Sequence, residues 1–238
     1  MKKLIPILLF LFSFQAIHAQ FGISAGYKPI IAKNWDQVIA QHRLNVENAE
    51  SFANGIQLSA DYWFRLKNHR VEFLPELSFT RFTRFWQNED GLIAEEKIRS
   101  NFIGFHFNTN FYIFDFKGDC DCPTFSKQGN DIAKGFFIQV APGVDYVSNS
   151  YKNEGFSETA NDIVPSVGIG IGVDFGLNNL LTVTPMLKVH RYFGVDWDNL
   201  NTYFETPQQS ISPEFNKNDI TQFFAGIRIG LRLDAKKY

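Results

Sequence analysis

Alternation of apolar and polar residues with a period of two recurs in eight segments of this 238-residue chain. The segments span residues 20–28, 54–65, 70–84, 100–116, 135–149, 162–176, 179–193 and 219–233. Because successive side chains of a β-strand point to opposite faces, each segment is predicted to be a strand with one apolar face. Beyond the first 19 residues, weak helical amphipathicity is confined to residues 34–54. The pattern therefore predicts an all-β chain with no second domain.

The two faces of the predicted strands differ in composition. One phase is apolar and carries no charge, as at Ile169 and Ile171, whereas the other is small or polar, as at Gly168 and His106. A solvent-exposed face would instead be rich in Lys, Glu and Thr. The interior of an eight-stranded soluble barrel is too narrow for so many Phe, Ile and Leu side chains. We therefore expect the apolar phase to face lipid, in an eight-stranded antiparallel up-and-down transmembrane β-barrel.

Connections between the predicted strands fall into two alternating sets. One set is shorter overall, with residues 66–69, 117–134 and 178–179. The other set is longer, with residues 29–53, 85–99, 150–161 and 194–218. Short turns at one rim and long loops at the other are typical of outer-membrane barrels.

Residues 1–19 have the pattern of a cleaved secretory signal. Two lysines precede an apolar run at residues 4–14, and residues 16–19 (Ala-Ile-His-Ala) match the small-x-small cleavage pattern. The run is shorter than the ~20 residues that a spanning helix needs. We expect one barrel domain over residues 20–238, located in the outer membrane with lipid as its partner. The net charge of −2 argues against a nucleic-acid partner.

Aromatic residues near strand ends predict the two interfacial girdles of such a barrel. They are Tyr27, Tyr62, Phe64, Phe79, Phe102, Tyr146, Phe175, Tyr192 and Phe193. Four prolines also fall inside strand windows, where each removes a ladder hydrogen bond. We expect bulges or kinks at Pro75, Pro142, Pro165 and Pro185, with residues 140–143 as the strongest bulge candidate.

Three stretches resemble a known family. Residues 21–27 (Phe-Gly-Ile-Ser-Ala-Gly-Tyr), after a signal ending in Ala-Gln, are similar to the start of Bacteroidota outer-membrane β-barrel proteins of the PorT-like type. Residues 141–146 and 224–231 are similar to that family as well. The resemblance implies an eight-stranded barrel with periplasmic termini and no catalytic residues. One branch of the family serves type IX secretion and gliding, but no motif here marks this chain as a member of that branch.

The phase assigned to the lumen carries five acids, four bases and two histidines. These residues are Asp61, Arg65, Glu72, Glu76, His106, Asp145, Asp174, Lys188, His190, Arg228 and Arg232. Because buried charges must be paired, this balance predicts a network of salt bridges that plugs the lumen. Passage of ions or protons is the alternative, although eight strands leave little open bore. A lipid-modifying enzyme would need His106 or His190 to meet a nucleophile, and no nucleophile motif surrounds either histidine.

Cys120 and Cys122 form a C-x-C pair flanked by Asp119 and Asp121. In an oxidising periplasm, two cysteines favour a disulfide, but so small a ring would be strained and easily reduced, so a disulfide or two free thiols is expected. Binding of a soft metal such as zinc by the two thiolates and the two carboxylates is the weaker alternative, because one C-x-C is a weak signal compared with paired C-x-x-C motifs. We expect no resident metal or cofactor. By strand parity this turn is periplasmic, so it could contact a protein partner there.

Aromatic residues also occur in two of the longer connections. Trp35 lies in residues 29–53, and Trp197, Tyr203 and Phe204 lie in residues 194–218. Such side chains either bind glycans or pack as a lid over the barrel, and we favour the lid. The sequence as a whole predicts a non-enzymatic outer-membrane barrel with a structural or accessory role, acting through its loops or its periplasmic turn. A narrow channel or a secretion-associated component is the alternative.

Overall fold

The computed structural model describes residues 20–42, 54–66, 69–86, 96–114, 132–153, 156–178, 180–204 and 211–232. The strands are β1 (Gln20–Lys28), β2 (Ile30–Ile31), β3 (Gly55–Tyr62), β4 (Phe64–Arg65), β5 (Val71–Trp86), β6 (Glu96–Phe111), β7 (Phe136–Asn153), β8 (Phe156–Val173), β9 (Phe175–Gly176), β10 (Leu181–Asp196) and β11 (Lys217–Arg232). The helices are α2 (Lys33–His42), α3 (Ile132–Gly135), α4 (Leu200–Phe204) and the 3₁₀ helix η2 (Pro213–Asn216). No helix among these elements is long and apolar enough to cross a membrane.

The strands close into a ring of eight. Each strand pairs antiparallel with its neighbours in the order β1, β3, β5, β6, β7, β8, β10 and β11. The ring closes where β1 pairs with β11, from Gln20 opposite Arg232 to Tyr27 opposite Ala225. The short strands β4 and β9 continue β3 and β8 after one-residue interruptions. The predicted eight-stranded antiparallel barrel is confirmed.

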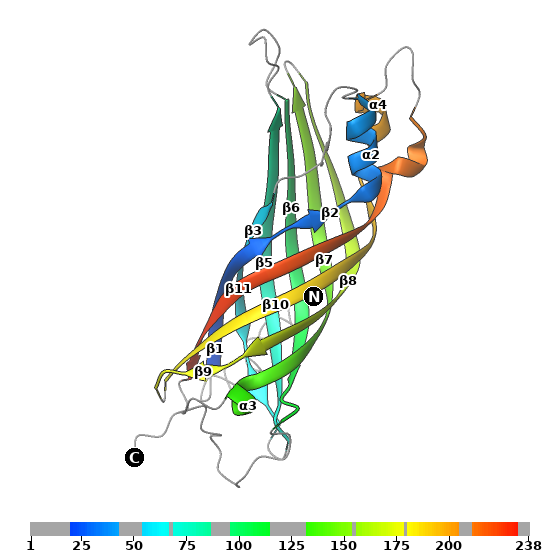
Figure 1. Ribbon diagram of the computed structural model, residues 1–238. Coiled ribbons are helices and arrows are strands. Elements are labelled where there is room, and N and C mark those ends of the chain that lie inside the picture. The colour runs from blue at the N-terminus through cyan, green and yellow to red at the C-terminus, as the bar shows by residue number, and fades with distance from the viewer. Residues whose placement is uncertain are drawn as a thin grey trace, which may run out of the picture.

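Figure 1 shows how the wall is arranged. Strands β5 to β8 rise upright to one end, whereas β1, β10 and β11 cross obliquely. Helices α2 and α4 lie at the end to which β5 to β8 rise, and the paired ends of β1 and β11 lie at the opposite end. We call these two ends the helical end and the terminal end.

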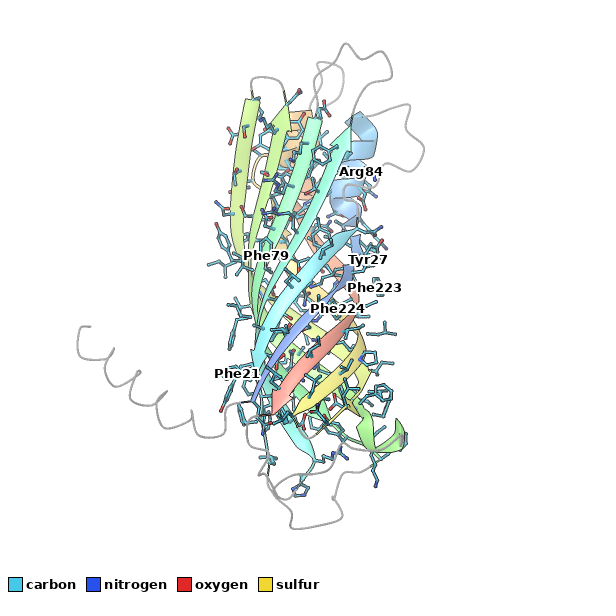
Figure 2. All side chains as sticks on the ribbon, turned by 90° about the vertical axis from the view of Figure 1, so that its left-hand side faces the viewer. Phe21, Tyr27, Phe79, Arg84, Phe223 and Phe224 are labelled. Carbon is cyan, nitrogen blue, oxygen red and sulfur yellow. The ribbon has the colours of Figure 1, made fainter. Side chains whose placement is uncertain are left out.

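Toward the terminal end, the strands turn their apolar side chains outward and their small or polar side chains inward, as predicted. Ile169 and Leu77 are 64% and 60% exposed, whereas Gly168 and Ser78 beside them are buried. Apolar side chains therefore cover the outside of the barrel and small or polar side chains fill its inside. In Figure 2, Phe21 and Phe79 project from this outer surface at two different heights. We call this outer band of apolar side chains the apolar belt.

The apolar belt ends abruptly toward the helical end. Outward-facing residues change from apolar to polar within one step, from Phe79 to Arg81 on β5 and from Ile103 to Asn101 on β6. The same change occurs from Tyr146 to Ser148 on β7, from Ile163 to Asn161 on β8, from Val189 to Arg191 on β10 and from Phe223 to Thr221 on β11. On β5 to β8 the switching residues are directly paired neighbours. On β5 to β8 the switch therefore marks one level of the wall, and beyond it Phe85 on β5 and Phe193 on β10 are exposed apolar residues.

Above that switch the strands continue for several more residues. The strands β5, β6, β7 and β8 have 16, 16, 18 and 18 residues. A strand crosses a bilayer with about 9–11 residues. We call the part of the barrel beyond the switch, together with α2, α4 and η2, the tip. Most of the residues buried inside the tip are apolar, as in a soluble barrel, although Ser100 and Asn149 are buried there too.

The extra strand length overturns part of the predicted loop pattern. Residues 150–161 were expected as a long loop, but β7 runs to Asn153 and β8 begins at Phe156. The apolar phase changes from outward to inward here, at Tyr151, Ala160 and Val164. A strand predicted from one apolar phase therefore ends at the switch, whereas the strand in the structure continues beyond it.

The expected proline bulges are wrong for the described strands. Pro75, Pro165 and Pro185 keep the pairing register of their neighbours. The pairs flanking Pro142 also keep one register, with His106 opposite Gly143 and Thr109 opposite Val140. A register shift occurs instead between Tyr192 and Val195 on β10, beside Gly194, which has a φ of 64°. A positive φ is easily adopted by glycine, which has no Cβ, so this bulge forms at a glycine and not at a proline.

Two members of the predicted girdles are also misplaced. Phe102 and Tyr192 are 1% and 0% exposed, because both share the inward phase of their strands. They belong to the interior of the tip. Tyr27, Phe64, Phe79, Tyr146, Phe175 and Phe193 are exposed on the outside, and Tyr62 is half-buried.

Candidate functional site: lumen and tip

The lumen near the terminal end is crossed by a buried charge pair. The Arg228 guanidinium on β11 donates from Nε to Asp61 Oδ2 on β3 at 2.7 Å, and Nη2 donates to Asp61 Oδ1 at 2.5 Å. Both side chains are buried. Gly22 on β1 lies beneath this pair, where a Cβ would collide with the guanidinium and the carboxylate. The glycine of the inward phase therefore makes room for the pair.

A second carboxylate group lies in the same region. The Tyr112 hydroxyl bridges Glu72 Oε2 at 2.7 Å and Asp174 Oδ2 at 2.5 Å. The Thr184 hydroxyl donates to the other oxygen of Asp174 at 2.5 Å. The Arg70 guanidinium lies 4.6 Å from the centre of the Tyr112 ring. Through Tyr112, which follows β6, these contacts join Glu72 on β5 to Asp174, which lies between β8 and β9, and Asp174 in turn meets Thr184 on β10.

The middle of the lumen holds Glu76, His106, Asp145 and Lys188. Glu76 Oε2 accepts from Lys188 Nζ at 3.2 Å and from Asn108 Nδ2 at 3.0 Å. His106 Nε2 lies 3.1 Å from Asp145 Oδ2, and its Nδ1 lies 3.8 Å from Glu76 Oε1. The lysine, the histidine and the two carboxylates thus form one connected cluster.

The two buried histidines lie side by side in the lumen. Their rings are 5.0 Å apart, and His106 and His190 are 0% and 2% exposed. The nearby Ser166 hydroxyl donates to Asp145 Oδ2 at 2.7 Å, the same oxygen that His106 contacts. A nucleophilic serine must instead be hydrogen-bonded to its histidine base. The described geometry therefore holds His106 and Ser166 on one carboxylate, and both side chains are buried.

Several lumen residues extend the network beyond the predicted set. Lys28 Nζ donates to Gln57 Oε1 at 2.7 Å and to the Tyr192 hydroxyl at 3.1 Å. The Ser24 and Ser59 hydroxyls are 2.7 Å apart. Lys28 continues the inward phase of Gly22, Ser24 and Gly26, so the period-two pattern of β1 contained the signal that would have identified it.

Of the eleven predicted lumen residues, nine have described side chains, and all nine are buried. The structure brings Asp61 to Arg228, and Glu76 to Lys188 and His106. The backbones of Arg65 and Arg232 lie in β4 and β11, but their side chains are outside the described part of the chain. Cys120 and Cys122 also lie outside it. No group of three His, Cys, Asp or Glu residues suited to a metal occurs among the described residues.

Above the charge network, an apolar core fills the tip. We call it the tip core; its buried residues are Ala32, Trp35, Val38, Ile39, Phe82, Ile98, Phe102, Val147, Tyr151, Ala160, Val164, Tyr192, Val195, Trp197, Leu200, Ile211 and Ile220. The period-two pattern did not predict this core, because it assigns a polar inward phase to the whole length of each strand. Tyr192 joins the two zones, since its ring packs 5.2 Å from Phe102 while its hydroxyl meets Lys28.

Helix α2 closes the tip core like a lid. Trp35, Val38 and Ile39 lie on one helix face and are buried, as the i, i+3, i+4 spacing of a helix requires. The Trp35 and Trp197 rings meet edge to face at 5.3 Å. Trp35 Nε1 also donates to the carbonyl oxygen of Asn216 at 3.0 Å. The lid alternative is confirmed for both tryptophans; the side chain of Phe204 lies outside the described residues.

An open hollow of about 520 Å³ lies on the tip. Its lining comprises Tyr151, Asn153, Phe156, Glu158, Asn199, Thr202 and Tyr203. The Tyr203 ring stacks on Tyr151 at 5.8 Å and meets Phe156 edge to face at 5.6 Å. Partial burial, and secondarily the charge of Glu158, raise the pKa of Tyr203. The hollow thus combines aromatic faces with neutral and acidic hydrogen-bonding groups.

The fold and this interior define a class: a transmembrane β-barrel of eight strands whose lumen is occupied by its own side chains. No family model matches the chain, and no curated protein matches it. Among solved structures, Neisserial surface protein A is 9% identical with a TM-score of 0.44, covering 92% of this chain and 98% of that chain. The attachment invasion locus protein Ail of Yersinia pestis is 10% identical with a TM-score of 0.47, covering 89% and 98%. A major outer membrane protein of Thermus thermophilus is 12% identical with a TM-score of 0.46, covering 90% and 99%. These likenesses are too distant to bear on function, and the fold stands on the strand pairing itself.

Proposed function

We propose that this chain is a non-enzymatic outer-membrane protein that acts through its exposed tip and not through its bore. In this proposal the apolar belt crosses the membrane, the terminal end faces the periplasm and the tip stands outside the cell. The height of the belt supports this placement, because its strands present four to six outward apolar residues before the polar switch, close to the span of about 9–11 residues.

The observation that carries the proposal is the double closure of the lumen. Charged side chains join across the lumen, in its middle through Lys188 and Glu76 and near the terminal end through Arg228 and Asp61. Above them the tip core packs from Phe82 and Phe102 to Trp197, and the buried Ser100 hydroxyl within the tip donates to Asn149 Oδ1. A barrel filled in this way offers its outer surface, and not a passage, to other molecules. The open hollow at Tyr151 and Tyr203 is the part of the tip best shaped for contact.

Two measurements test the proposal together. Planar-bilayer recording should give no steady conductance, and a large stable conductance would contradict it. In whole cells, a photo-crosslinking residue at Glu158, in the hollow, should capture a surface or extracellular molecule. The matched probe at Ser148, at the first polar level above the belt, should capture none. Equal capture at both positions would contradict the claim that the protein acts through specific contacts at its tip.

A role beside a secretion apparatus is the second form of this proposal. It would place the partner contact at the periplasmic turn that carries Cys120 and Cys122. Co-purification of a stoichiometric partner in mild detergent, lost on deletion of residues 118–123 but not on substitution of Glu158, would favour this form over the tip.

A further inference from the structure

The outer wall carries an apolar groove on β8, β10 and β11. The groove has a volume of about 470 Å³ and is open to the outside. Its outward lining includes Ile169, Leu187, Val189, Phe223 and Ala225. Ala225 is the small residue of this set, and it pairs with Leu187 on β10 and with Tyr27 on β1. A groove forms because a short side chain stands among long ones.

A basic hollow lies directly above the groove on the same strands. Arg191 is the next outward residue after Val189 on β10, and Thr221 is the next after Phe223 on β11. The step between such residues is about 7 Å along a strand. The hollow has a volume of about 620 Å³, and its lining includes Lys33, Asn34, Arg191, Lys217, Asp219 and Thr221.

The charge of this hollow is positive. Lys33, Arg191 and Lys217 contribute three positive charges against the single carboxylate of Asp219. Asp219 pairs with Arg191, with Arg191 Nη2 donating to its Oδ2 at 3.1 Å, and its Oδ1 accepts from the Gly194 backbone. Lys33 and Lys217 are both exposed, so their ammonium groups face the outside. Among its lining residues the hollow therefore carries two cations beyond the one balanced by Asp219, and one of them, Lys217, also interacts with Asp196 outside the lining.

We propose that the groove and the hollow form one site for a phosphate-bearing lipid of the surrounding leaflet. The acyl chain lies along Val189, Phe223 and Ala225, and the phosphate lies between Lys33, Arg191 and Lys217. The polar switch supports this occupant, because it passes between the groove and the hollow at the level where headgroups meet acyl chains. Arg, Lys and backbone donors are the groups that hold phosphate oxygens. This inference rests on the proposed placement in a membrane.

Native mass spectrometry of the full mature protein tests the site. The barrel is folded into detergent micelles with dioleoyl phosphatidylglycerol or dioleoyl phosphatidylcholine, which share their acyl chains and differ in headgroup charge. We expect one retained phosphatidylglycerol, with at least fivefold preference over phosphatidylcholine. The triple variant K33Q/R191Q/K217Q should lose that preference, and the matched triple variant R81Q/K97Q/K152Q, on the outward face of β5 to β7, should keep it.

A larger side chain in the groove tests whether the groove holds the acyl chain. Ala225→Leu should lower retention of both lipids at least fivefold, whereas Ala60→Leu, on the outward face of β3 and outside the groove, should not. Inorganic phosphate should fail to displace the lipid. Unchanged preference in the first triple variant, or displacement of the lipid by phosphate alone, would overturn the lipid site. Failure of the wild-type barrel to insert into vesicles would instead overturn the membrane placement on which the inference rests.

Discussion

At the scale of single residues, the lumen is held together by pairs of side chains that lie far apart in the sequence. Asp61 and Arg228 are 167 positions apart, yet their two hydrogen bonds tie β3 to β11 on either side of β1. Removing one partner would leave a buried charge uncompensated, whereas a surface pair is largely compensated by water. The same pair therefore contributes both to stability and to closure of the ring.

Replacing Arg228 with Leu should destabilise the folded barrel by about 3–5 kcal/mol, because the Asp61 carboxylate would remain buried without its partner. Replacing Arg191 with Gln, which breaks the exposed pair with Asp219, should cost ~0–1 kcal/mol. Urea unfolding of the barrel in micelles, followed by the mobility difference between folded and unfolded forms, gives both values. Similar losses for the two variants would show that the lumen pair is hydrated.

At the scale of elements, the tip is built from two segments far apart in the chain. Helix α2 follows β1, while α4 and η2 precede β11, and they meet through Trp35 and Trp197. Asn201 and Asn216 exchange hydrogen bonds at 2.8 and 2.9 Å, which fixes α4 against η2. The lid is therefore held by packing and by hydrogen bonds of its own, independently of the apolar belt.

Replacing Trp197 with Ala should cost about 3–5 kcal/mol, the range for large aromatic residues in a packed core. The expected result is a tip that opens while the barrel in the membrane persists. Limited proteolysis of the protein in vesicles should then cut near α2 and α4, with the folded-barrel mobility unchanged. Phe193→Ala, on the outside of β10, is the control and should leave the cleavage pattern as in the wild type. Loss of the folded-barrel mobility in the Trp197 variant would mean that the tip and the belt fold as one unit.

At the scale of the whole molecule, period-two patterning predicted the strand number, the closure and the face that meets lipid. It could not predict the polarity switch. The pattern assumes that the apolar phase faces outward along the whole strand, whereas beyond the switch the apolar phase faces inward. Phe102 and Tyr192 were misassigned for this reason. The lumen pairs were predicted as a set of residues, but which residue meets which depends on ring geometry that spacing alone does not contain. Lys28 and Tyr112 lay in the correct phase and were overlooked.

Ile169→Arg and Asn161→Arg test the switch on one strand. Both positions face outward on β8, on opposite sides of the switch. Arginine near the middle of the bilayer costs about 2–4 kcal/mol, so the Ile169 variant should assemble poorly into vesicles. The Asn161 variant should assemble as the wild type does. Equal assembly of the two variants, measured as the folded fraction on an unheated gel, would contradict the assigned level of the membrane.

The seam between β1 and β11 also has a consequence for the order of folding. The first strand of the barrel cannot complete its pairing until the last strand is present, and the hydrogen bond from Trp35 to Asn216 spans 181 positions. Contacts between such distant parts of a chain form slowly, because the intervening chain must be ordered before they are gained. The lid should therefore close late, after the strands between the two chain ends have paired. Until then the apolar residues of the tip stay uncovered, and that interval is when this protein most needs a chaperone.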